Sequence, residues 1–208
     1  MPDSEAPGLR LIAGLGNPGR DYEGTRHNAG FAVLDGLASR LGVSFVKEPK
    51  WDAWIAGVPG RDLVLLKPAT FMNLSGEAVA GYARFHRIPH GSVLVVADDV
   101  ALPPGTIRLR REGGSGGQKG LESVLVHFAT EQVPRLRIGV GGASTGGDLS
   151  GHVLSRFRPE ELPVIGEAVS RSAEAVLCAV ERGLGTAMNL YNALPVPDKS
   201  QHQHTEQP

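Results

Sequence analysis

His27 is the histidine whose position along the chain best fits a catalytic base. It follows a polar stretch at residues 21–26 and directly precedes a segment whose apolar residues have helical spacing. The amino-terminal end of a helix disfavours an imidazolium ring, whereas a nearby carboxylate favours it. A histidine between two such influences can stay neutral and still accept a proton near neutral pH. If Asp98 orients the ring, the free ring nitrogen can remove a proton from water.

Three further polar segments each follow a strand-like apolar run. They are GNPG at residues 16–19, KPATFMN at residues 67–73, and the Asp98-Asp99 pair after VLVVA. In open α/β sheets, ligands bind beyond the carboxyl ends of the strands. We therefore expect Asn17, Asn73 and Asp98 to line one crevice. Each also has a local explanation, since Asn17 suits a turn, Asn73 precedes a helix and Asp98 can cap a strand end.

Two glycine-rich segments match motifs of other chemistries. Residues 14–19 fit the dinucleotide pattern G-x-G-x-x-G, but Pro18 and a polar stretch separate them from the next helix. A pyrophosphate needs that helix to begin at once. Ser115 lies in a G-x-S-x-G match at residues 113–117, but the preceding strand is amphipathic rather than central. Neither an NAD-dependent enzyme nor a serine hydrolase is favoured.

The elements that must position these residues alternate between strand-like and helix-like segments. Apolar spacing predicts a long last helix that opens at residues 159–161, where a proline and two carboxylates suit a first helical turn. The alternation indicates a single α/β layered domain with a twisted, mixed and largely parallel sheet flanked by helices. The predicted strands are residues 9–15, 54–58, 63–66, 93–97, 107–111 and 136–140, and the other predicted helices are residues 29–41, 75–86 and 119–128.

Length and composition place the chain among ordinary globular proteins. It has 208 residues, of which 41% are hydrophobic and 21% charged, which suits one core. One cysteine excludes an intrachain disulfide, and no apolar run reaches the roughly 18 residues of a membrane span. We expect a cytoplasmic protein with no membrane association. We also expect a flexible lead at residues 1–8, one domain at 9–194 and a disordered tail at 195–208.

The charges are balanced overall but not along the chain. The chain has 21 Lys and Arg residues and 22 Asp and Glu residues, which gives a formal net charge of −1. Between residues 106 and 137, six basic residues accompany three acidic ones. Arg108, Arg110 and Lys119 lie in this stretch and could hold RNA phosphates, although a solvated sheet edge explains the same pattern.

Several segments, in order along the chain, resemble the bacterial peptidyl-tRNA hydrolases. The combination of GNPG, TRHNAG and FMNLSG is specific to that family, whereas a glycine motif alone is not. The resemblance spans nearly all of residues 9–194. The segments are LIAGLGNPGRDYEGTRHNAG (11–30), KPATFMNLSG (67–76), VVADDVALPPG (95–105), EGGSGGQKGL (112–121), LRIGVG (136–141) and GHVLSRF (151–157).

The resemblance implies a monomeric single-domain hydrolase that cleaves the ester between a peptide and the 3′ ribose of tRNA, without metal or cofactor. It recycles tRNA released from stalled ribosomes. His27 is then the base, Asp98 its stabilising partner, Asn17 a residue that distinguishes N-blocked substrates, and Asn73 a donor to the reacting carbonyl. The aminoacyl-ribose end of peptidyl-tRNA would contact the segment that carries Tyr22 and the segment that carries Phe71, Met72 and Asn73.

The glycine-rich loop departs from the family pattern. Gln118 and Lys119 stand where the family commonly has His-Asn. A lysine donates hydrogen bonds but cannot accept one, so Lys119 cannot position a water as asparagine does. Its charge could hold a phosphate or stabilise an oxyanion instead. Ala97, Ala101 and His152 also differ from the residues that are frequent at their positions in the family.

Two functions from different classes therefore remain. The intact set of His27, Asp98, Asn17 and Asn73 favours a peptidyl-tRNA hydrolase. The altered loop at Gln118 and Lys119 leaves open a non-catalytic RNA-binding protein on the same fold. Hydrolysis of an N-blocked aminoacyl-tRNA separates the two.

Overall fold

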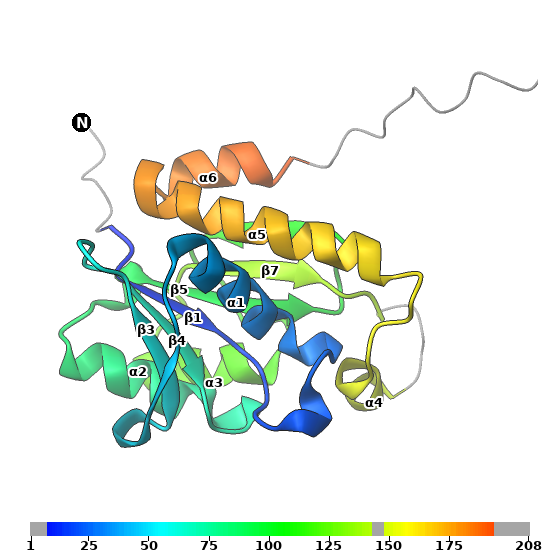
Figure 1. Ribbon diagram of the computed structural model, residues 1–208, viewed down its shortest axis with the longest axis horizontal. Coiled ribbons are helices and arrows are strands. Elements are labelled where there is room, and N and C mark those ends of the chain that lie inside the picture. The colour runs from blue at the N-terminus through cyan, green and yellow to red at the C-terminus, as the bar shows by residue number, and fades with distance from the viewer. Residues whose placement is uncertain (1–7, 143–147, 194–208) are drawn as a thin grey trace, which may run out of the picture.

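The structure is a computed structural model that describes residues 8–142 and 148–193. The expected flexible lead falls outside these ranges except for Gly8, and the expected tail at 195–208 falls wholly outside them. Between these limits, the chain forms one α/β layered unit (Figure 1).

A seven-stranded mixed sheet forms the centre of the molecule. Its strand order is β2-β3-β4-β1-β5-β7-β6. The inner strands β4, β1, β5 and β7 run parallel, while β3 and β6 are each antiparallel to the strand beside them. The predicted fold class is thereby confirmed. The strands are β1 (Leu11–Gly14), β2 (Val46–Glu48), β3 (Ala53–Gly57), β4 (Val64–Pro68), β5 (Val93–Asp99), β6 (Ile107–Arg110) and β7 (Arg135–Gly139).

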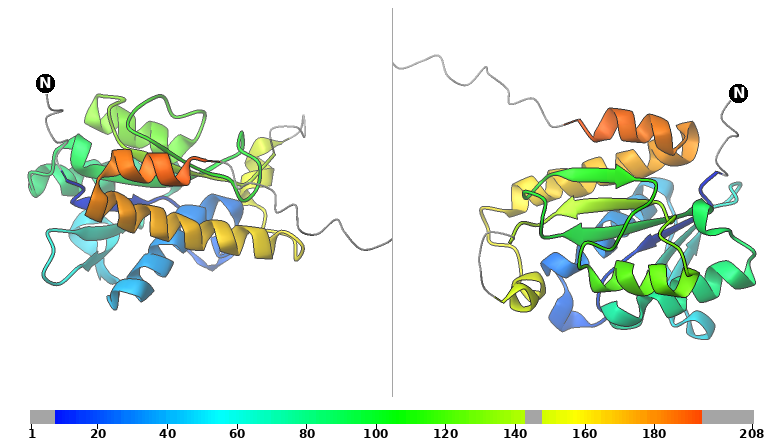
Figure 2. Two further views of the ribbon diagram at one scale, coloured as in Figure 1. Left: turned by 90° about the horizontal axis from the view of Figure 1, so that it is seen from above. Right: turned by 180° about the vertical axis from the view of Figure 1, so that it is seen from behind.

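Helices cover both faces of the sheet. One face packs against α1 (Ala29–Leu41), α5 (Leu162–Arg182) and α6 (Leu184–Tyr191), while the other packs against α2 (Ser75–Phe85) and α3 (Lys119–Phe128). Figure 1 shows α1 and α5 in front of the sheet, and the view from behind in Figure 2 shows α3 on the opposite face. A short helix, α4 (Leu149–Leu154), lies beyond the carboxyl end of β7.

The strand β5 carries the alternation that builds the two halves of the core. All seven of its residues are buried. Leu94 and Val96 contribute to the core beneath α1 and α5, while Val93, Val95 and Ala97 contribute to the core beneath α2 and α3. Because side chains alternate along a strand, Asp98 and Asp99 continue this pattern on opposite faces.

Helix α1 packs close against the sheet because it begins with Ala29 and Gly30. A methyl group added at Gly30 would collide with the carbonyl oxygen of Val96 and with the backbone of Leu15. Glycine lets the first turn of α1 lie directly on β1 and β5. This contact brings the residues just before α1, among them His27, to the carboxyl end of β5.

The last helical segment differs from its prediction at both ends. Helix α5 begins at Leu162 rather than at Pro159, and it is Pro163 that occupies the first turn. At the other end, Gly183 adopts a φ of 86° and separates α5 from α6, which apolar spacing alone did not reveal. Glycine adopts a positive φ without the steric penalty that a Cβ imposes, so the helix can end there. The short β2 and α4 were also not predicted, because three to six residues carry too little periodicity.

Two remaining sequence predictions concern the burial of Cys178 and the absence of a membrane-spanning segment. Cys178 is buried in the core, as expected of a small apolar filler. Within the described residues, no helix is both long and apolar enough to cross a membrane.

Candidate active site

A cavity of about 580 Å³ opens beyond the carboxyl ends of the parallel strands. It brings together segments that are distant in the sequence, including the loop after β1, the turn after β4, the end of β5, the glycine-rich loop before α3, and α4. Its lining residues are Asn17, Tyr22, His27, Phe71, Met72, Asn73, Asp98, Asp99, Val100, Gly116, Gly117, Gln118, Lys119, Leu149, Ser150, Val153 and Leu154. Asn17, Asn73 and Asp98 thus line one cavity.

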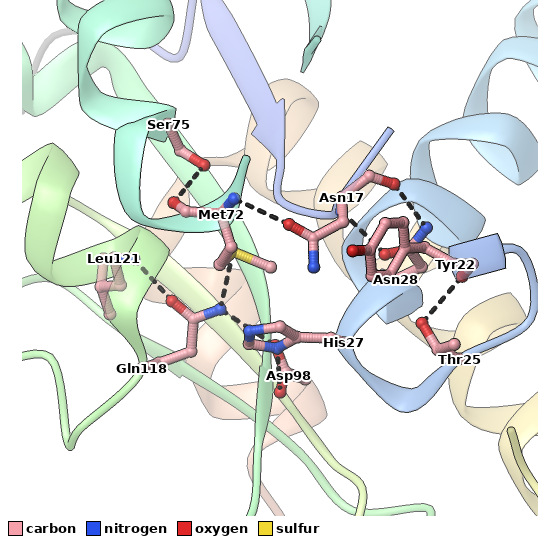
Figure 3. Close-up of polar contacts among 10 residues, drawn as sticks. All are labelled: Asn17, Tyr22, Thr25, His27, Asn28, Met72, Ser75, Asp98, Gln118 and Leu121. Atoms are coloured by element: carbon pink, nitrogen blue, oxygen red, sulfur yellow. Dashed lines mark hydrogen bonds and ion pairs between the residues drawn. The ribbon is translucent and has the colours of Figure 1, made fainter. Parts of the chain in front are cut away.

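His27 and Asp98 form a buried pair in this cavity (Figure 3). The Nδ1 atom of His27 lies 2.9 Å from both carboxylate oxygens of Asp98. An ionised carboxylate only accepts hydrogen bonds, so a hydrogen bond in this contact requires the proton on Nδ1, and in the neutral ring Nε2 then carries the lone pair. Among the described residues, Nε2 has no hydrogen-bond partner. The exposed fractions of 8% for His27 and 2% for Asp98 keep the pair away from bulk water.

Strand alternation separates Asp98 from its neighbour Asp99. Asp98 lies on the α1 face, where the short 3-10 turn Arg26–Asn28 presents His27. Asp99 lies on the opposite face, where its Oδ2 atom is 2.9 Å from Nε of Arg137. Its Oδ1 atom accepts from the backbone N–H of Ala101. Asp99 therefore stabilises the loop after β5, and Asp98 alone is available to His27.

Asn17 is fixed in both backbone and side chain. Its backbone N–H donates to Oδ1 of Asn28 at 2.9 Å, and its carbonyl accepts from Nδ2 of the same residue at 3.0 Å. Its side-chain Oδ1 accepts from the backbone N–H of Met72 at 2.8 Å. The amide nitrogen of Asn17 then points toward the His27 side of the cavity (Figure 3). Asn28 was not singled out from the sequence, although it directly follows His27.

Gln118 connects the glycine-rich loop to the buried pair. It is the N-cap of α3, where its Oε1 accepts from the backbone N–H of Leu121 at 2.6 Å. Its Nε2 donates to Oδ1 of Asp98 at 3.0 Å and lies 3.2 Å from the sulfur of Met72. Gly120 permits this packing, because an added methyl group there would collide with the same sulfur.

The remaining walls of the cavity are aromatic, apolar and cationic. Tyr22 and Phe71 meet edge to face, with ring centroids 6.5 Å apart, and Phe71 is mostly exposed. Helix α4 contributes Leu149, Val153 and Leu154. Lys119 and Asn73 are exposed and leave an ammonium group and an amide at the cavity surface.

Arg108 and Arg110 lie outside the cavity lining, on the edge strand β6. They face Arg137 and Arg135 respectively across the β6–β7 ladder. Arg135 is buried and donates to the backbone carbonyls of Gly113, Gly114, Glu131 and Val133. Burial, with help from the charge of Arg137, lowers the pKa of the Arg135 guanidinium.

The turn that carries His27 is anchored by its neighbour Arg26. This buried side chain donates to Ser155 Oγ at 2.8 Å, to the Arg156 carbonyl at 2.6 Å and to Glu161 Oε2 at 2.6 Å. Partial burial acts to raise the pKa of Glu161, but hydrogen bonds from Arg158 and Arg26 and their charges outweigh it, and the pKa is lowered. The anchor joins the turn to the segment between α4 and α5.

Neither glycine-rich motif forms the site of its alternative chemistry. Residues 14–19 lead into a short 3-10 turn, Arg20–Tyr22, and α1 begins only at Ala29. Ser115 is absent from the cavity lining and accepts from the backbone N–H of Gly117. Within the described residues, no group of three or more His, Cys, Asp or Glu side chains is arranged to hold a metal ion.

Comparison with known proteins decides the family. The model of the peptidyl-tRNA hydrolase family matches residues 11–202. The chain belongs to the peptidyl-tRNA hydrolase family. It is therefore assigned to the hydrolases, and the sequence resemblance and the predicted enzyme class are confirmed.

Individual relatives support the family over almost the whole chain. The peptidyl-tRNA hydrolase of Caldanaerobacter subterraneus subsp. tengcongensis is 49% identical, covering 88% of this chain and all of that protein. The peptidyl-tRNA hydrolase of Akkermansia muciniphila is 44% identical, covering 92% and 99%. The crystal structure of peptidyl-tRNA hydrolase from Acinetobacter baumannii superimposes with a TM-score of 0.84 at 36% identity, covering 89% of this chain and 95% of that one.

Proposed function

We propose that the protein hydrolyses the ester bond between the peptidyl group and the 3′ ribose of peptidyl-tRNA, and so recycles peptidyl-tRNA released from stalled ribosomes. The observation that carries this proposal is the His27 ring held by both oxygens of Asp98 inside a cavity. Family membership supplies the ester substrate, and the pair supplies a base for water.

The buried pair supports general-base activation of water. His27 Nε2 removes a proton from a water molecule as its oxygen attacks the ester carbonyl carbon. The imidazolium that forms is stabilised by Asp98, whose negative charge lies 2.9 Å from Nδ1. When the tetrahedral intermediate collapses, the proton passes to the ribose 3′ oxygen, and the peptide leaves with a free carboxyl group. Such a base contributes about 10²- to 10⁴-fold in rate.

The two cavity asparagines support recognition of the acyl group. Asn73 has an amide at the cavity surface that can donate to the carbonyl oxygen as negative charge develops on it. Asn17 offers its amide nitrogen, because its oxygen is occupied by the N–H of Met72. A donor in that place suits the carbonyl of an N-acylated amino acid. A free α-ammonium group also has only donors, so neither it nor the Asn17 amide nitrogen would find an acceptor in this contact.

Other residues support binding of the tRNA end. Tyr22 and Phe71 provide aromatic surface on which the terminal adenine can stack, and Met72 lines the wall beside them. Lys119 carries a positive charge at the cavity surface that suits a backbone phosphate.

Arg108 and Arg110 extend this basic surface beyond the cavity. The arginine opposite each of them is already compensated inside the protein, Arg137 by Asp99 and Arg135 by backbone carbonyls, so Arg108 and Arg110 are the members of these pairs that can reach a phosphate. They contact the tRNA backbone and do not read base sequence.

The test compares two substrates that differ only at the α-nitrogen. Purified protein is incubated with N-acetyl-aminoacyl-tRNA and, in parallel, with the same unblocked aminoacyl-tRNA, each with EDTA. We expect rapid release of the N-acetyl amino acid and little release from the unblocked substrate. Binding of tRNA without release from the blocked substrate would instead favour the non-catalytic RNA-binding protein. Equal release from both would remove the selectivity assigned to Asn17.

A further inference from the structure

The Gln118 side chain is held in one orientation by what lies at each of its ends. Its Oε1 accepts the backbone N–H of Leu121, and its Nε2 faces the carboxylate of Asp98. If the amide were turned over, a donor would face the N–H of Leu121 and an acceptor would face the carboxylate. Both contacts would then be repulsive. Capping of α3 therefore fixes the amide nitrogen toward Asp98.

Asp98 is a buried carboxylate that needs such a donor. In the part of the chain that the structure describes, its side chain accepts hydrogen bonds from two groups, His27 Nδ1 and Gln118 Nε2. A carboxylate that is 2% exposed loses its hydration and depends on protein donors to keep its charge and its rotamer. His27 moves a proton during the reaction, whereas the Gln118 amide does not.

We propose that Gln118 is a positioning residue for the catalytic pair, which holds the Asp98 carboxylate in the orientation that receives His27 Nδ1. The inference rests on the proposed function and adds to it a link from the start of α3 to the base. It also gives the departure at position 118 a role, since the amide supplies a fixed donor that is never charged.

The packing around Gln118 keeps this link short. Met72 lies against Nε2 through its sulfur, and its backbone N–H is held by Asn17. The absence of a side chain at Gly120 lets this sulfur approach the start of α3. Gln118 thus lies between the segment that orients Asn17 and the carboxylate that orients His27.

The test separates the donor from the helix cap. Gln118→Thr keeps a good N-cap, because a threonine hydroxyl accepts from the third N–H of a helix, but it cannot reach Asp98. Gln118→Glu keeps the acceptor for Leu121 and places a second carboxylate beside Asp98. We expect both variants to fold, and we expect Gln118→Glu to melt at a lower temperature because its carboxylate lies beside the buried carboxylate of Asp98. We expect kcat for N-acetyl-aminoacyl-tRNA to fall roughly 10- to 100-fold in Gln118→Thr, the effect of one hydrogen bond to a charged group, with KM unchanged.

We expect a larger loss in Gln118→Glu, because its carboxylate repels that of Asp98. Gln132→Thr makes the threonine substitution at an exposed glutamine outside the site and serves as the control. A Gln118→Thr variant with the wild-type kcat would overturn the proposal. So would a loss of kcat in Gln132→Thr of the same size.

Coupling to Asp98 distinguishes positioning from a general structural effect. In an Asp98→Asn background the carboxylate is already gone, so adding Gln118→Thr should lower kcat by less than about threefold. If the fold losses of kcat from the two substitutions instead multiply fully in the double variant, Gln118 acts independently of the pair and the proposal is wrong.

A measurement without substrate keeps the proposal testable if the protein hydrolyses nothing. Nitrogen-15 NMR of the histidine rings distinguishes an Nδ1–H ring from an Nε2–H ring. We expect His27 to be the Nδ1–H form in the wild type and to gain the Nε2–H form in Gln118→Thr, as Asp98 loses its fixed orientation. Identical His27 signals in both proteins would overturn the role of Gln118, whatever the outcome of the substrate test.

Discussion

Asn28 uses both ends of its side-chain amide on the backbone of a single residue, Asn17. Oδ1 of Asn17 accepts a hydrogen bond from the N–H of Met72. Because this contact fixes the orientation of the Asn17 amide, its nitrogen remains available to a ligand. Selectivity for a blocked α-nitrogen would then depend on Asn28, a residue that does not line the cavity around His27.

The residue-level prediction concerns this clamp. Asn28→Ala removes both hydrogen bonds and frees the loop after β1, so the Asn17 amide loses its orientation. We expect kcat/KM for N-acetyl-aminoacyl-tRNA to fall about tenfold, the worth of one to two neutral hydrogen bonds, and the preference over unblocked substrate to shrink. Parallel kinetics on the two substrates measure both effects.

A matched control exists elsewhere in the chain. Asn192 clamps the backbone of Leu109 in the same two-ended way, at 2.7 and 3.0 Å. Asn192→Ala should cost comparable stability and leave the substrate preference unchanged. An equal loss of preference in both variants would mean that destabilisation, and not the Asn17 clamp, causes it.

The sequence revealed the cavity residues that follow strands, but it did not reveal the contacts by which Gln118 and Asn28 orient them. Asn17, Asn73 and Asp98 could be placed together because parallel strands end at one edge of a sheet. The contact between Gln118 and Asp98 depends on where α3 begins relative to β5, and the Asn28 clamp depends on how a 3-10 turn faces a loop. Neither geometry follows from residue type or spacing.

At the scale of elements, Arg26 ties the turn before α1 to the start of α5. Its guanidinium reaches Ser155, Arg156 and Glu161, and its Cζ atom lies 5.0 Å from the ring centre of Phe157. The turn contains His27, so this anchor helps to place the base although it lies outside the cavity.

A pH-dependent prediction follows from the lowered pKa of Glu161. A carboxyl group whose pKa is lower in the folded state stabilises the fold above its unfolded value of 4.5, and this contribution disappears as pH falls through the lowered pKa. We expect Glu161→Gln to reduce the free energy of unfolding at pH 7 by about 1 kcal/mol, because the amide oxygen can still accept from Arg26 and Arg158 but lacks the charge that strengthens these hydrogen bonds. Below pH 4.5 the difference should shrink toward zero.

Denaturant unfolding of both proteins at several pH values measures this difference. Glu174→Gln is the control, since Glu174 pairs with Arg40 on an exposed surface, where an ion pair contributes little. A difference for Glu161→Gln that stays constant down to the acid range would show that its ionised form does not stabilise the fold.

The long elements were predicted to within a few residues, and the short ones were not. Helices α1 and α3 match their predicted ranges because their apolar stripes persist over several turns. The expected start of α5 at Pro159 was wrong, since a proline is equally suited to the turn before a helix and Pro163 takes the first turn instead. The three-residue β2 owes its pairing to β3, which spacing does not encode.

At the scale of the whole molecule, the net charge of −1 hides a local excess of arginine on β6 and β7. If tRNA phosphates lie along this face, binding releases counterions and weakens as salt rises. The predictions of a monomer and of a cytoplasmic location stay predictions at this scale.

The prediction for this surface is a change in salt dependence. Arg108→Gln with Arg110→Gln should weaken tRNA binding similarly for different tRNAs, and should reduce the slope of log affinity against log salt by about 2, one for each lost phosphate contact. Arg61→Gln with Arg182→Gln removes the same charge from exposed positions outside this face. Equal slopes in both double variants would show that β6 does not touch the phosphates.

The central claim is that His27 activates water for ester hydrolysis, and His27→Ala tests it most directly. Single-turnover release of N-acetyl amino acid from N-acetyl-aminoacyl-tRNA is measured at saturating protein, together with tRNA affinity in the same buffer. The account predicts a loss of roughly 10²- to 10⁴-fold in the hydrolysis rate with unchanged tRNA binding. Hydrolysis by His27→Ala at the wild-type rate would contradict it and would place the base elsewhere in the cavity.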